Sequence, residues 1–178
     1  MIEIKVGQIN VTFMRYIYLS LAIILSVLVS RFLIHPPNFT NIIALSFYIP
    51  AIFGRKYIPV IIFSFLFTDF FIGFHKLTFF TWGSVLVIGM FSIYFKKKPL
   101  NRLFGASFGA VTFFIITNLG VWLTGKYGYS FEGFITCYTL AIPFFYNTLV
   151  STIIFGIIIE LLLRLFSFFK FDLEKNNL

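Results

Sequence analysis

The chain has 178 residues, of which 60% are hydrophobic and 11% are charged. With 28 phenylalanines and a mean hydropathy of +0.98, this composition excludes a soluble globular domain. The formal net charge is +8, but the lysines and arginines form small clusters between apolar segments, which indicates membrane topology and not nucleic-acid binding. The single cysteine, Cys137, excludes an internal disulfide bond and a Cys-pair metal motif.

The apolar segments predict an all-α, polytopic membrane protein, because about 20 apolar residues span the ~30 Å hydrocarbon layer as a helix. About six transmembrane helices are expected, at 14–34, 41–53, 57–74, 78–95, 103–123 and 131–169. The predicted organisation is a cytoplasmic segment 1–13, a transmembrane domain 14–169 and a cytoplasmic tail 170–178.

Prolines, glycines and lysines mark the boundaries between these helices. Pro36 and Pro37 end the first helix, and residues 96–98 followed by Pro99 end the fourth. Pro143 predicts a kink or break inside the last, overlong segment. The second helix has only 13 residues, so it spans the membrane only if its ends are buried in protein or it tilts little.

The basic residues divide unequally between the two sides of a six-helix arrangement. Eleven lie on the side of the termini, namely Lys5, Arg15, Arg55, Lys56, Lys96, Lys97, Lys98, Arg102, Arg164, Lys170 and Lys175. The other three, Arg31, Lys76 and Lys126, lie on the opposite side. Since lysine and arginine in short loops favour the cytoplasm, we expect a multi-pass protein of the bacterial inner membrane with both termini in the cytoplasm.

Two acidic residues fall inside the expected helices, where a charge costs about 2.5 to 3.5 kcal/mol on insertion scales. Asp69 lies near the outer end of its helix. It either faces a cavity that opens outward or pairs with Arg31 or a nearby hydroxyl. Glu160 lies four residues before Arg164, a spacing that predicts an ion pair along one helix face.

Other polar side chains concentrate on the predicted outer half. The amides of Asn118 and Asn147 need partners in hydrocarbon, which neighbouring helices or a bound ligand would supply. No nucleophile with a base and no phosphate-binding loop emerges, so neither catalysis nor a cofactor is expected. His35, His75 and Asp69 are the closest approach to a metal site, but histidines at loop edges are commoner as interface residues, and no metal is expected.

Small residues recur every four positions in two of the expected helices, a spacing that lets another helix approach closely. They are Ala22, Ser26 and Ser30 in the first helix, and Gly105, Ala106, Gly109 and Ala110 in the fifth. These faces contact either other helices of this chain or a partner subunit.

Four segments together resemble an uncharacterised family of bacterial membrane proteins: 35–40, 68–75, 117–123 and 137–149. That family is similar, more distantly, to the substrate-binding S components of energy-coupling factor (ECF) transporters. The resemblance implies an S-component-like bundle of six helices with an outward-facing vitamin pocket. By position, it places Asn38, Asp69, Asn118, Trp122 and Asn147 in that pocket.

The same resemblance implies that the first helix meets a transmembrane coupling subunit. Ala22 and Ser26 stand where S components carry two contact alanines. The cobalt and nickel members begin with a Met-His signature, whereas this chain begins Met1-Ile2-Glu3, so a metal substrate is disfavoured.

We therefore expect a substrate-capture subunit of an importer for a small organic nutrient, a vitamin or a precursor. Its partners would be a transmembrane coupling subunit and ATPases, in the lipid bilayer and without nucleic acid. The expected binding residues are Asn38, Asp69, Trp82, Asn118, Trp122, Tyr138 and Asn147, with the aromatic ones as walls. The alternative is a structural or assembly subunit of a larger membrane complex.

Overall fold

The structure is a computed structural model that describes the backbone of residues 2–175 and the side chains of residues 13–167. All its regular elements are helical, which confirms the predicted all-α class for this part of the chain. The α-helices are α1 (Ile2–Phe32), α2 (Ile42–Phe53), α3 (Ile58–Ile72), α4 (Thr78–Phe91), α5 (Pro99–Leu123), α6 (Phe131–Leu140) and α7 (Ile142–Lys175). Two short 3-10 helices, η1 (Arg55–Tyr57) and η2 (Ser92–Phe95), precede α3 and extend α4.

Four stretches are long and apolar enough to cross a membrane: Phe13–Phe32, Thr78–Phe95, Pro99–Leu123 and Ile142–Ser167. By these apolar helices the chain is a multi-pass membrane protein, as predicted. The helix α2 is apolar but shorter than these four stretches. The number of six membrane crossings therefore stays a prediction.

Helix α1 begins at Ile2, well before the predicted helix 14–34. Its apolar, membrane-length part begins at Phe13, close to the predicted start. No proline interrupts the more polar residues before that point, so the helical hydrogen bonds continue through them. At the other terminus α7 continues to Lys175, and residues 176–178 of the predicted tail lie outside the described residues.

Helix α2 forms the centre of the bundle. Every residue from Ile42 to Ala51 is buried, and the helix contacts α3, α4, α5 and α7. The rings of Phe47 and Tyr48 are completely buried. A helix that is apolar on all sides is stable when other elements cover all of them, and α2 is covered by protein. This explains how so short a helix is accommodated.

The small residues of α5 serve the packing of this chain. Ala106 and Ala110 are completely buried, and a Cβ atom on Gly105 would collide with the ring of Phe47. The absence of side chains beyond Cβ thus lets α5 approach α2 closely. Of the two alternatives for this face, contact within the chain is confirmed.

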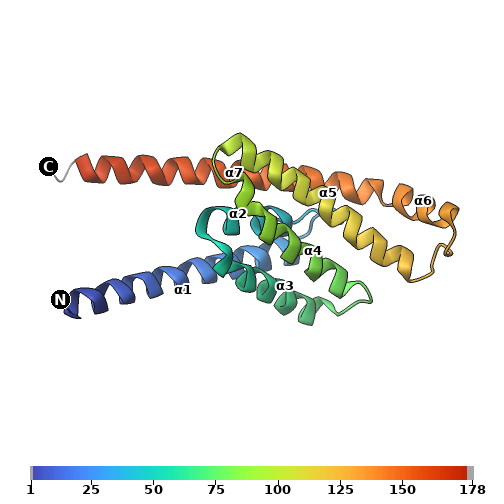
Figure 1. The fold of residues 1–178 in the computed structure, drawn as a ribbon, viewed down its shortest axis with the longest axis horizontal. Helices are drawn as coiled ribbons and strands as arrows, with labels where there is room; N and C mark the ends of the chain where they lie inside the picture. Colours follow the sequence, from blue (N-terminus) through green and yellow to red (C-terminus); the bar gives the residue numbers. More distant parts are fainter. Residues whose placement is uncertain (1, 176–178) are drawn as a thin grey trace.

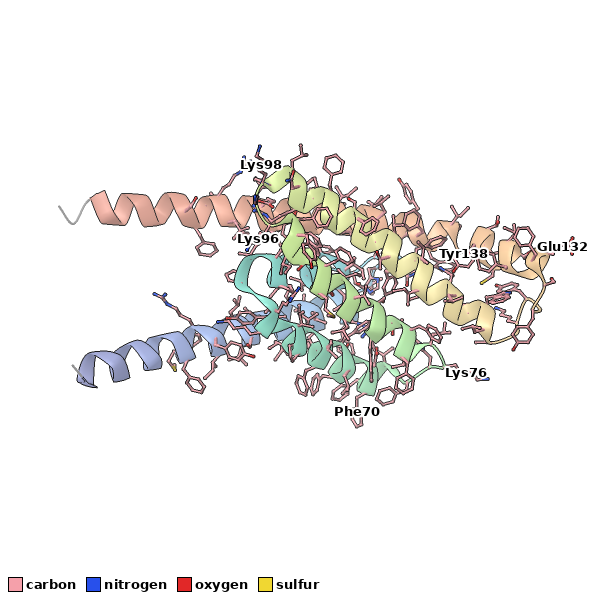
Figure 2. The ribbon with its side chains drawn as sticks, viewed as in Figure 1. Phe70, Lys76, Lys96, Lys98, Glu132 and Tyr138 are labelled. Carbon is pink, nitrogen blue, oxygen red and sulfur yellow. The ribbon has the colours of Figure 1, made fainter. Side chains whose placement is uncertain are left out.

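The bundle has two distinct ends. Figure 1 shows both termini on one side, where α1 and α7 extend beyond the other helices. We call this the basic end, because Arg55, Lys56 and residues 96–98 lie there, as Figure 2 shows for Lys96 and Lys98. The loop end is the opposite side, defined by the loops 73–77 and 124–130, and the loop 33–41 lies nearer the middle of the molecule (Figure 1).

Candidate functional site

A cavity lies at the loop end and consists of two adjoining chambers of about 300 Å³ each. Both chambers are lined by Asn38, His75, Thr81, Phe113 and Thr148. These residues come from two loops and from α4, α5 and α7. The cavity is therefore formed by segments that lie far apart in the sequence, and it exists only when the bundle is assembled.

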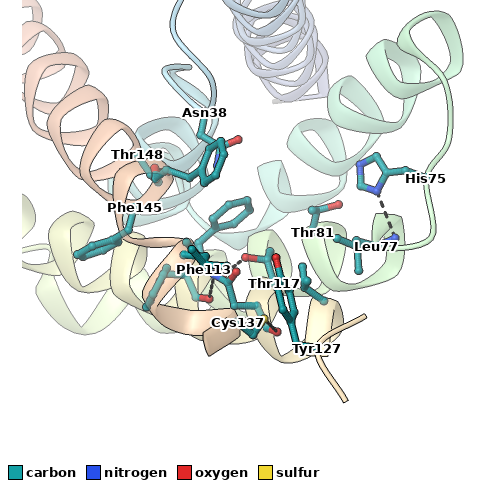
Figure 3. Close-up of a pocket in the computed structure, with 16 residues that line it drawn as sticks. Asn38, His75, Leu77, Thr81, Phe113, Thr117, Tyr127, Cys137, Phe145 and Thr148 are labelled. Carbon is teal, nitrogen blue, oxygen red and sulfur yellow. Dashed lines mark hydrogen bonds between the residues drawn. The ribbon is translucent and has the colours of Figure 1, made fainter. Parts of the chain in front are cut away.

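The first chamber lies between α5 and the start of α7 (Figure 3). Its apolar wall includes four aromatic side chains, Phe113 and Phe114 from α5 and Phe144 and Phe145 from α7. Among its polar lining residues are Asn38, His75, Thr81, Thr117, Asn118 and Tyr127. A concave, largely apolar space with a few polar groups is the usual form of a small-molecule site, and such sites measure about 300 to 1,000 Å³.

The break between α6 and α7 lines this chamber. Ala141 is the single residue between the two helices, and it lies against the cavity together with Leu140. Pro143 has no N–H group, so it cannot continue the hydrogen-bond pattern of α6. The predicted break at Pro143 is confirmed. Irregular backbone at membrane depth is tolerated where protein covers it or where it lines a cavity.

Three polar side chains of the first chamber already donate hydrogen bonds within their own helices. The hydroxyls of Thr81 and Thr117 each donate to a carbonyl of their own helix across 2.8 Å. Asn118 likewise donates from Nδ2 to the carbonyl of Phe114 across 2.7 Å. Because these groups already donate within their helices, their oxygen atoms are left as acceptors for a ligand.

His75 adds a donor to this set. Its Nδ1 accepts a hydrogen bond from the backbone N–H of Leu77 across 3.2 Å (Figure 3). In the neutral ring the proton therefore resides on Nε2, which is free to donate. The cavity thus offers several acceptors, together with donors from Nε2 of His75 and from the second N–H of the Asn118 amide, on a mostly apolar wall.

The second chamber is lined by Arg31, which the structure holds in a buried ion pair. The Nη1 atom of Arg31 lies 2.6 Å from Oδ1 of Asp69, and Trp82 donates from Nε1 to Oδ2 of Asp69 across 2.8 Å. Asp69 is only 1% exposed. Of the two alternatives for Asp69, the pairing with Arg31 is the one observed. Asp69 and Trp82 lie behind Arg31, outside the cavity lining.

Two further predicted site residues also lie behind the wall. Tyr138 donates its hydroxyl to the carbonyl of Ile115 across 2.8 Å, and its ring packs on Phe114. Trp122 packs edge-on against Phe134, and its indole N–H is buried without a hydrogen-bond partner among the described residues. Of the seven predicted binding residues, the structure thus places Asn38 and Asn118 in the lining, and contact with a ligand stays a prediction for all seven.

Asn147, the seventh predicted residue, supports the cavity from outside. Its Nδ2 donates to the carbonyl of Pro37 across 3.0 Å. Pro37 precedes Asn38, so this bond fixes the loop that carries Asn38 against α7. Asn147 therefore has a partner within the chain, from a loop and not from a neighbouring helix.

The small residues of α1 form a second internal contact. Asn41 donates from Nδ2 to the hydroxyl of Ser26 across 2.7 Å, and Ser30 donates to Oδ1 of Asn41 across 2.6 Å. Ser26 and Ser30 thus hold the start of α2 to α1. Ala22 is exposed, and its predicted contact with a partner subunit stays a prediction.

The predicted ion pair between Glu160 and Arg164 is wrong. Both oxygens of Glu160 lie 2.7 Å from nitrogens of Arg102 in α5. Arg102 is 58 residues away in the chain but adjacent in space, because α5 packs against α7. A fork-like pair with arginine is stronger than a single contact on one helix face.

The aromatic and hydroxyl groups of the cavity wall were missed by sequence reasoning. They are Phe113, Phe114, Thr117, Phe145, Thr148 and Tyr127. The sequence of α5 does contain a pattern that indicates this wall. Phe113, Thr117 and Val121 are spaced by four residues, so they share one helix face beside Asn118. Within the described residues, no group of three His, Cys, Asp or Glu side chains is placed to hold a metal ion.

The fold and the cavity define a multi-pass, all-helical membrane protein with a ligand-sized space at one end. The chain belongs to a family of unknown function, DUF6580, whose model matches residues 11–172. The expected membership of an uncharacterised membrane family is thereby confirmed. Comparisons with curated proteins and with solved structures gave no match.

Proposed function

We propose that this chain is the substrate-capture subunit of an importer for a small organic nutrient and performs no catalysis itself. The observation that carries the proposal is the two-chambered cavity at the loop end, with aromatic walls and a few hydrogen-bonding groups. This division between apolar burial and a few orienting polar groups is what small-molecule sites require. The resemblance to ECF S components points to the same function.

The charge distribution supports capture from outside the cell. The loop end carries Arg31, Lys76 and Lys126, whereas the other eleven basic residues belong to the opposite side. Under the positive-inside rule the cavity then opens away from the cytoplasm. A coupling subunit and ATPases would supply the energy, since the sequence has no nucleotide-binding motif.

The lining also defines the chemistry of the proposed substrate. Thr81, Thr117 and Asn118 present acceptor oxygens, so a ligand with N–H or O–H donors fits best. The only cationic side chain of the lining, apart from the histidines, is that of Arg31, and Asp69 neutralises it. We therefore propose an uncharged molecule with an aromatic or apolar body and several donors.

Thermal unfolding of the purified protein with a panel of vitamins and precursors tests this function. A ligand at 100 times its dissociation constant stabilises the folded protein by about 2.7 kcal/mol. The stabilisation is expected to fall in Asn118→Ala and to persist in Asn101→Ala, a matched control at the exposed basic end of the same helix. If no compound in the panel stabilises the protein, or both variants respond like the original, the proposal fails.

An assembly subunit of a larger membrane complex is the second candidate. It is favoured by α1, whose outer face bears Tyr18, Leu21, Leu25 and Val29 exposed in a row along the helix. The exposed Ala22 lies on the same helix. Purification of a stable complex that is lost in Ala22→Phe, together with no ligand response, would favour this candidate.

A further inference from the structure

A groove runs along the surface between α5 and α7 near the basic end and shares no residue with the loop-end cavity. Its wider part has a volume of about 530 Å³, its narrower part about 190 Å³, and both parts are lined by Leu100 and Leu103. We call this the α5–α7 groove. Its other apolar lining residues are Phe104, Ile153, Ile157 and Leu161.

The mouth of the groove is positively charged. Lys98 and Arg164 line it, one at the start of α5 and one on α7 (Figure 2 labels Lys98). Glu160 also lines it, but both its oxygens are bound to Arg102. Among the described residues neither Lys98 nor Arg164 has an ion-pair partner. The two free cations therefore determine the sign of the local potential.

The start of α5 adds to this potential. The helix begins with Pro99, no side chain caps it, and its first turn has no acidic residue. The first-turn N–H groups and the helix dipole favour an anion at this position. The helix start thus reinforces the attraction that Lys98 and Arg164 exert.

The dimensions of the groove match one leaflet of a bilayer. Along α7 it extends from Arg164 to Ile153, about 16 Å at 1.5 Å per residue. Half of the ~30 Å hydrocarbon layer is about 15 Å. The cations lie at the basic end of this path, and the far part around Ser107 and Ile153 is almost entirely apolar.

We infer that the α5–α7 groove binds one anionic phospholipid. Its phosphate lies between Lys98 and Arg164, and one acyl chain follows the apolar wall toward Ile153. Charge at one end and an apolar path of leaflet length favour an anionic phospholipid over a zwitterionic one, whose headgroup cation is repelled by Lys98 and Arg164 and offsets the attraction of its phosphate. Basic pockets between transmembrane helices are known to bind anionic headgroups.

Native mass spectrometry of the purified, full-length protein tests this inference with phosphatidylglycerol and phosphatidylcholine as probes. The original protein is expected to retain phosphatidylglycerol in preference to phosphatidylcholine. The preference should fall by about fivefold for each cation removed in Lys98→Gln and Arg164→Gln. The control is the double variant Lys76→Gln with Lys126→Gln. It removes two positive charges at the loop end, as many as Lys98→Gln and Arg164→Gln remove together, and it should keep the preference.

A groove-filling variant, Ile157→Trp, separates the groove from general charge attraction. Ile157 is exposed, so the larger ring should be tolerated, and thermal unfolding checks that the variant is folded. Reduced retention of phosphatidylglycerol in folded Ile157→Trp is expected. Unchanged retention in this variant or in the cation variants would overturn the inference. The inference would also be overturned if the chain formed a dimer without bound lipid and Ile157→Trp disrupted that dimer.

Discussion

Asn147 of α7 donates a hydrogen bond from Nδ2 to the carbonyl oxygen of Pro37, 110 residues earlier in the chain, across 3.0 Å. The next residue, Asn38, lines both chambers and has a φ of +63°. Asparagine adopts this left-handed conformation more readily than most residues. The bond from Asn147 therefore positions a residue that is itself locally constrained, and the loop 33–41 becomes a fixed part of the cavity wall.

Replacing Asn147 with alanine should loosen this loop. The loss of one hydrogen bond costs about 1 kcal/mol, too little to unfold the bundle. Hydrogen–deuterium exchange in a peptide covering 33–41 should become faster, and ligand-induced stabilisation should decrease. The control Asn101→Ala should leave both unchanged. Equal exchange of this peptide in Asn147→Ala and in the original protein would refute the anchoring role.

The pair of Arg102 and Glu160 predicts a strong asymmetry between two substitutions near the basic end. Removing one partner of this partly buried pair leaves an uncompensated charge, so Arg102→Met should cost up to about 3 kcal/mol of unfolding free energy. Arg164→Met should cost little, because Glu160 does not bind Arg164. Unfolding in a graded mixture of mild and denaturing detergents measures both.

The double variant Arg102→Met with Glu160→Leu is the control for this pair. Apolar replacement of both partners is often neutral or stabilising, so most of the lost stability should return. If Arg164→Met destabilised the protein as much as Arg102→Met, the pairing would be refuted.

Two glycines offer a matched test of the packing between α2 and α5. Gly105 lies against Phe47, whereas the space around Gly83 in α4 is open. Gly105→Ala should cost about 1 to 3 kcal/mol through overpacking. Gly83→Ala should be neutral or stabilise the helix by up to about 1 kcal/mol. Thermal unfolding of both variants checks this, and a stabilising Gly105→Ala would contradict the close contact.

Labelling with a membrane-impermeant maleimide tests the predicted orientation. Lys97 and Lys126 are exposed at opposite ends, and Cys137, the single cysteine, is only 2% exposed and should give little background. In intact cells Lys126→Cys should be labelled at the outer surface, and Lys97→Cys should be labelled only after the membrane is permeabilised. Labelling of both positions in intact cells, or the reverse pattern, would contradict the orientation.

Helix ends were predictable because they depend on local chemistry. Helix α1 ends at Phe32, a few residues before Pro36 and Pro37. Helix α5 begins at Pro99, four residues before the expected start at Leu103. Pro143 marks the break before α7 because a missing N–H acts within one turn. The apolar part of α1 was equally clear from hydropathy.

Which side of each helix faces its neighbours was less predictable than where each helix ends. When a helix is apolar on all sides, the sequence does not specify which side meets its neighbours, so Trp122 and Tyr138 could not be assigned to the wall or to the space behind it. The partner of Glu160 was missed for a related reason. A partner four residues away is visible in the sequence, whereas Arg102 becomes a neighbour only when α5 packs on α7.

The proposed function requires a small organic molecule in the loop-end cavity, and extraction of the gently purified protein measures whether one is bound. Small molecules released from the original protein, Asn118→Ala and Asn101→Ala are identified and quantified by mass spectrometry. We predict one organic compound with N–H or O–H donors, close to one molecule per chain in the original protein and in Asn101→Ala, and strongly depleted in Asn118→Ala. No bound compound in any sample, or equal amounts in all three, would refute the proposed substrate-capture function.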